Sequence, residues 1–107
     1  MSSGPLAKLR VLDLTSVVVG PTCTWRLAQY GAEVIKVEAP EGDLMRGLGG
    51  PSPTGGHSGT YLHLNRGKRN ICLDLKKPGA RSAMDRLLAW AHPHGKWVRW
   101  CDPVIPA

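Results

Sequence analysis

Phenylalanine is missing from this 107-residue sequence, and aromatic residues of all kinds make up only 6% of it. A core must therefore be built mainly from Val, Leu, Ile, Ala and Met, which suits a sheet covered by helices. The hydrophobic share of 42% and the charged share of 21% argue against a disordered chain. The length favours one compact domain.

Long apolar runs and paired cysteines are also missing. No apolar run approaches the roughly 18 residues that span a bilayer, and the start, MSSGPLAKLR, lacks the basic-then-apolar order of a secretory signal. The cysteines, Cys23, Cys72 and Cys101, are widely spaced and form no CxxC motif, which argues against a disulfide framework and a zinc site. We therefore expect a cytoplasmic protein with reduced thiols and no metal.

Positive charge is concentrated in the second half of the sequence. The formal net charge is +6. Residues 61–107 hold nine Lys and Arg against three acidic residues, whereas residues 1–60 hold five of each kind. This distribution favours a polyanionic ligand, either a phosphorylated cofactor or a nucleic acid, but a solvated basic surface explains it equally well.

The apolar pattern predicts an α/β fold. Buried strands are expected at 9–14 and 32–38, separated by a helix over 21–30 that begins at a proline and ends before a glycine. A third strand at 69–75 and an amphipathic helix over 78–91 follow. The order βαβ, long loop, βα predicts part of a Rossmann-like parallel sheet, truncated at about half of a doubly wound domain.

Two segments lack a regular pattern. Residues 39–59 are rich in Gly and Pro and predict a binding loop or lid without secondary structure. Residues 92–107, HPHGKWVRWCDPVIPA, show neither helical nor strand periodicity, although the predicted helix before them is intact.

Three blocks of the sequence resemble the opening of CoA-transferase family III (CaiB/BaiF type). They are VLDLTSVVVGP at 11–21, LAQYGAEVIKVEAPEGDLMRG at 27–47 and LNRGKRNICLDLKKPGAR at 64–81. The family includes formyl-CoA transferases, carnitine CoA-transferases and α-methylacyl-CoA racemases. The resemblance implies a homodimeric enzyme of acyl-CoA metabolism whose Rossmann-like domain binds coenzyme A or acyl-CoA as a substrate.

Carried over by position, the resemblance implies a CoA-binding surface at the carboxyl edge of the sheet. The candidates come from the turn after the first strand, the end of the second strand, the exit of the third strand and the glycine-rich loop: Val18, Val19, Ala39, Leu73, Asp74, Leu75, Lys76 and Arg46. Lys76 offers a point charge for a phosphate. An ion pair with Asp43 explains Arg46 equally well. Relatives carry Gln in place of Val18 and Arg in place of Ala39, so two polar contacts are lost here.

The same resemblance places the catalytic groups beyond residue 107. In the transferases an Asp there attacks the acyl-CoA thioester, and the racemases use His and Asp bases that also lie downstream. Asp13 and Asp74 fall in predicted strands and Asp43 lies in the loop without a partner base, so none is nominated as a nucleophile. We therefore expect residues 1–91 to be the CoA-binding portion of a CoA-transferase domain, inactive alone.

Family members continue after the last helix with an apolar strand. Because residues 92–107 lack one, we interpret them as an aberrant tail from a frameshift or a gene truncation. The alternative function is a non-catalytic CoA-binding or interaction module that pairs with a second copy or a full-length relative.

Two further clusters have weak functional interpretations. His92 and His94 form an HxH pair but lack a third metal ligand at a standard spacing. Arg66, Lys68 and Arg69 resemble a nucleic-acid patch, yet they match the family's own turn better.

Overall fold

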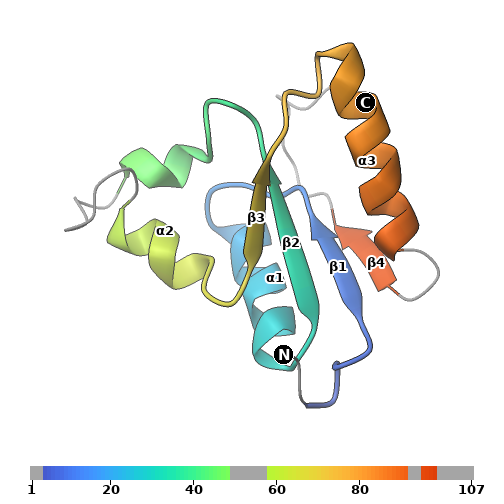
Figure 1. Cartoon of the computed structure of the whole chain (residues 1–107). Coiled ribbons are helices and arrows are strands. Elements are labelled where there is room, and N and C mark those ends of the chain that lie inside the picture. Colours follow the sequence, from blue (N-terminus) through green and yellow to red (C-terminus); the bar gives the residue numbers. More distant parts are fainter. Residues whose placement is uncertain (1–3, 49–57, 92–94, 99–107) are drawn as a thin grey trace.

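Four parallel strands form one open sheet in the order β3-β2-β1-β4 (Figure 1). This computed structural model describes residues 4–48, 58–91 and 95–98. The strands are β1 (Arg10–Asp13), β2 (Glu33–Glu38), β3 (Arg69–Cys72) and β4 (Gly95–Val98). The predicted α/β class, with a parallel and unclosed sheet, is confirmed.

Helices cover both faces of the sheet. Helix α1 (Val19–Gln29) packs against β1 and β2, and α3 (Pro78–Ala91) packs against β1 and β4 on the opposite face (Figure 1). This arrangement follows from the alternation of side chains along β1, since Val11 belongs to the core on the α1 side and Leu12 to the core on the α3 side. Within the described ranges, no helix combines the length and apolar character that a membrane crossing needs.

Two short helices were not predicted from the sequence. The 3₁₀ helix η1 (Leu44–Gly47) lies within the loop 39–59 that was expected to have no regular structure, and α2 (Gly59–Leu64) begins at the last residue of that loop. Each begins at a polar cap: the Asp43 carboxylate accepts the N–H of Met45, and the Ser58 hydroxyl accepts the N–H of Tyr61. Such caps satisfy backbone donors that the first turn leaves unpaired, so a short helix forms even in a glycine-rich segment.

Strand β4 corrects the prediction that the residues after α3 contain no strand. Residues 95–98 pair in parallel with β1, from Arg10 opposite Gly95 to Asp13 opposite Val98. The physical reason is that β1 pairs with β2 on one side only, and its other edge carries backbone groups that need partners. Sheet pairing therefore outweighs the weak local periodicity. His92, His94 and residues 99–107 lie outside the described residues.

Candidate functional site

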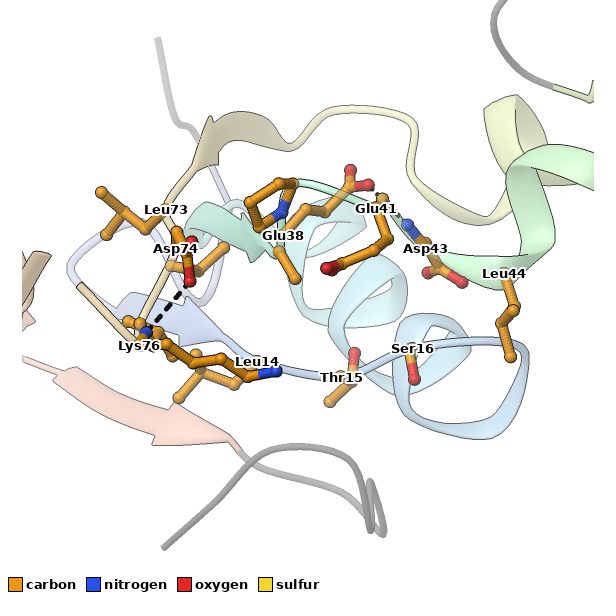
Figure 2. A pocket seen from close by; sticks show the side chains of 15 residues that line it. Leu14, Thr15, Ser16, Glu38, Glu41, Asp43, Leu44, Leu73, Asp74 and Lys76 are labelled. Atoms are coloured by element: carbon orange, nitrogen blue, oxygen red, sulfur yellow. Dashed lines mark hydrogen bonds between the residues drawn. The ribbon is translucent and has the colours of Figure 1, made fainter.

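A cavity of about 450 Å³ opens where β1, β2 and β3 end (Figure 2). Three segments line it: 14–16 after β1, 37–44 from the end of β2 to the start of η1, and 73–76 after β3. In Figure 2, Thr15 and Ser16 from the turn after β1 face Glu41 and Asp43 from the turn after β2. Open parallel sheets bind ligands at the carboxyl ends of their strands, and the volume is in the usual range for small-molecule sites.

Five of the eight predicted site residues line this cavity. Ala39 comes from the end of β2, and Leu73, Asp74, Leu75 and Lys76 come from the exit of β3. The backbone N–H of Lys76 donates to Asp74 Oδ1 at 3.1 Å, which fixes the shape of this turn (Figure 2). The side chain of Lys76 is exposed. An ammonium group is thus available at a mainly apolar cavity.

The other three predicted residues lie outside the cavity lining. Val18 and Val19, at the start of α1, are 42% and 61% exposed. The guanidinium of Arg46 binds Glu38, with 2.8 Å from Nε to Oε2 and 2.8 Å from Nη2 to Oε1. The ion pair that the sequence suggested between Arg46 and Asp43 is therefore formed with Glu38 instead.

Glu38, which lines the cavity, is the centre of a hydrogen-bonded cluster. Its carboxylate accepts from Arg46, from the Tyr61 hydroxyl, from the Asn70 amide and from the backbone N–H of Asp43. Burial alone would raise the pKa of Glu38, but these donors, Arg46 foremost, outweigh it and lower the pKa from 4.5 to about 2. Contact with Glu38 also raises the pKa of Arg46. The cluster therefore keeps this carboxylate ionised.

Two buried ion pairs lie next to this cluster. Lys36 Nζ is 2.7 Å from Asp43 Oδ2, and Lys68 Nζ is 2.9 Å from Asp13 Oδ2. All four side chains are 1% exposed or less. Asn65 Oδ1 accepts from both ammonium groups, at 3.1 Å from Lys36 and 2.8 Å from Lys68. Burial lowers the pKa of Lys68, an effect that Asp13 opposes.

These pairs bear on two sequence-based interpretations. Asp43, expected to lie in the loop without a partner base, has a cationic partner, because the Lys36 ammonium group donates to it; this group is a counter-charge and not a base. Lys68 is buried against Asp13, so it does not form a surface patch with Arg66 and Arg69. The signal that was missed is a lysine among the apolar residues of a buried strand, because a buried charge needs a counter-charge nearby. In the part of the chain that the structure describes, no three His, Cys, Asp or Glu side chains cluster as metal ligands.

Comparison with known proteins gives concordant matches. The sequence model described as CoA-transferase family III matches residues 6–92. A succinyl-CoA:mesaconate CoA-transferase of Haloarcula hispanica is 48% identical over 84 residues, which are 75% of this chain and 21% of that protein. A formyl-CoA:oxalate CoA-transferase of Rhodopseudomonas palustris is 46% identical over 98 residues, 91% of this chain and 20% of that protein.

A solved structure agrees with these matches. The crystal structure of a CAIB/BAIF family protein from Brucella suis is similar with a TM-score of 0.73 and 39% sequence identity, over 82% of this chain and 24% of that one. The chain spans about one fifth of the length of the curated relatives that it matches.

Proposed function

Because the chain belongs to CoA-transferase family III, we propose that the cavity at the ends of β1, β2 and β3 is part of a binding site for coenzyme A or an acyl-CoA. The observation that carries this proposal is that Ala39 and residues 73–76, which the family resemblance implicates, line one cavity. Apolar walls suit the adenine ring or the pantetheine arm of CoA. The ammonium group of Lys76 suits a phosphate.

Val18, Val19 and Arg46 remain in the proposal with different roles. Val18 and Val19 are exposed at the start of α1 and are proposed to contact a part of CoA that extends beyond the cavity. Arg46 is proposed to act through Glu38, whose backbone leads directly into Ala39, rather than by binding a phosphate itself.

We further propose that the complete reaction is the transfer of CoA between carboxylic acids through an aspartyl nucleophile, and that residues 1–91 supply CoA binding and not the nucleophile. The buried carboxylates support this division. Asp13 and Asp43 each bind a lysine, and Glu38 binds Arg46. Their oxygens are occupied by donors, which makes them poor nucleophiles. Pairing with a second copy or a longer relative belongs to the same proposal.

A cytoplasmic location is also proposed. The described cysteines, Cys23 and Cys72, are exposed free thiols. Thiols of this kind persist in a reducing compartment, where disulfides are rare.

The test is isothermal titration of the purified chain with CoA. Wild type should bind saturably, and Lys76→Ala should weaken binding by about tenfold or more, because a charge-assisted contact to phosphate contributes about 1.5–3 kcal/mol. Lys77→Ala is the matched control, since this neighbouring exposed lysine does not line the cavity. Absence of binding by wild type would refute the proposed site, and equal losses in both variants would indicate diffuse charge attraction.

Catalysis is tested with the same sample. The chain alone should transfer no CoA from an acyl-CoA to a carboxylic acid, as followed by chromatography of the thioesters. Turnover at a rate above the uncatalysed reaction would contradict the division between binding and catalysis.

A further inference from the structure

Two separate loops form opposite walls of the cavity. Thr15 and Ser16, after β1, belong to one wall, and residues 39–44, after β2, belong to the other (Figure 2). Asp43 lies in the second wall, but its Oδ1 accepts the backbone N–H of Val17, next to the first wall, at 3.0 Å. A single side chain thus connects the two walls.

Lys36 fixes the position of this connecting side chain. Its Nζ lies 2.7 Å from Asp43 Oδ2, and both side chains are 1% exposed. Lys36 comes from β2, where it is in register with Asp13, the last residue of β1. The sheet beneath the cavity therefore holds Asp43 through a buried ion pair, which solvent screens much less than a surface pair.

The hydrogen bond from Val17 to Asp43 holds Val17 in a backbone conformation that valine does not favour. Its φ of 70° places a β-branched residue in the left-handed region, which such residues avoid. A conformation of this kind persists only where the surroundings impose it. Here the surroundings are the Asp43 carboxylate on the N–H of Val17 and the apolar cluster of Met45, Tyr61 and Leu64 against its side chain.

We propose that Lys36 and Asp43 are a positioning pair that sets the separation of the two cavity walls and thereby the affinity for the CoA ligand. The inference rests on the proposed function for the identity of the ligand. Without the pair, Val17 returns to a commoner backbone conformation and carries Ser16 with it, while Thr15 stays bound to Asp13. The cavity then loses its shape while the sheet and its helices remain.

The chain offers a matched comparison, Lys36→Met against Lys68→Met. Both lysines are 1% exposed, both form a buried ion pair, and both donate to Asn65 Oδ1. They differ in how their partners meet the cavity. Asp43 lines it and accepts from Val17, whereas Asp13 lies outside the lining and accepts from Thr15 and Thr24. Asp13 keeps both of these donors when Lys68 is removed, so Thr15 should stay in place. Both variants should lose similar stability to urea. At equal folded fraction, CoA affinity should fall at least tenfold in Lys36→Met and less than threefold in Lys68→Met, whereas equal losses would overturn the proposal.

Amide hydrogen exchange of the ligand-free chain separates this inference from the proposed function. The Val17 amide should be protected in wild type and in Lys68→Met, and it should lose protection in Lys36→Met while the β2 amides keep theirs. If wild type does not bind CoA, the proposed ligand is wrong, and the exchange data still decide whether the pair positions the wall. Retained protection of Val17 in Lys36→Met would refute it. Asp43→Asn, which keeps the side-chain shape, serves the same test if Lys36→Met does not fold.

Discussion

Replacing Glu38 by Gln should remove a large part of the acid sensitivity of this fold. The carboxylate is 5% exposed, and its donors lower its pKa from 4.5 to about 2. A difference of about 2.5 pH units corresponds to about 3 kcal/mol of folding free energy. Because the folded-state pKa is the lower one, this contribution is complete above pH 4.5 and is lost as the pH falls from 4.5 towards 2.

Urea unfolding of wild type and Glu38→Gln at about pH 6, 4 and 3 measures this contribution. At pH 6 the variant should be about 3 kcal/mol less stable than wild type, and by pH 3 the difference should shrink to about 1 kcal/mol as the wild-type carboxylate loses its advantage. Glu41→Gln is the control, because Glu41 is an exposed carboxyl residue of the same turn. The reasoning would be refuted by a difference between wild type and Glu38→Gln that stays constant over this pH range.

Two glycine-related predictions concern the turn after β1 and the first residues of α1. Val17→Gly should be about 1 kcal/mol more stable than Val17→Ala by urea unfolding, because only glycine adopts a φ of 70° without strain. At most positions the alanine variant is the more stable of the two. An equal or lower stability of the glycine variant would show that the turn relaxes. Gly20→Ala should lower the free energy of unfolding by about 1–3 kcal/mol, since a Cβ there would lie 2.4 Å from the Cβ of Thr15. Gly79→Ala is the control, because a Cβ at Gly79 would have nothing within 4 Å. Equal stabilities of the two variants would contradict the clash.

The sequence was sufficient to predict the elements that depend on local pattern. Strands β1 and β2 lie within the ranges predicted from short apolar runs, and α3 has the predicted bounds because one apolar stripe and a proline at its first position define it. Helices η1 and α2 were missed because each is short and begins at a single polar cap. Strand β4 was missed because its pairing partner, β1, lies at the other end of the described sequence.

The candidate site was predictable only in part, because the sequence places the ends of strands but does not identify the partners of individual side chains. Ala39 and the residues at the exit of β3 could be placed together, because the ends of neighbouring parallel strands meet at one edge. The partners of Lys36, Arg46 and Lys68 could not be assigned, since each side chain had several carboxylates within a plausible distance in sequence. Only the register of the sheet and the path of the glycine-rich loop select Asp43, Glu38 and Asp13.

The shared oxygen of Asn65 couples the two buried ion pairs energetically. Asp13, the Lys36–Asp43 pair and the Asn65–Lys68 segment come from three different blocks of the sequence, and one amide oxygen accepts hydrogen bonds from both lysines. Mutational effects at Lys36 and Lys68 should therefore not add, as residues of one hydrogen-bond network commonly show. An apolar replacement of either pair leaves Asn65 with one donor fewer, so its cost depends on which residues the other two blocks already carry. Substitutions at Lys36, Lys68 and Asn65 should therefore be epistatic, so that the order in which they occur affects which of them a folded chain accepts.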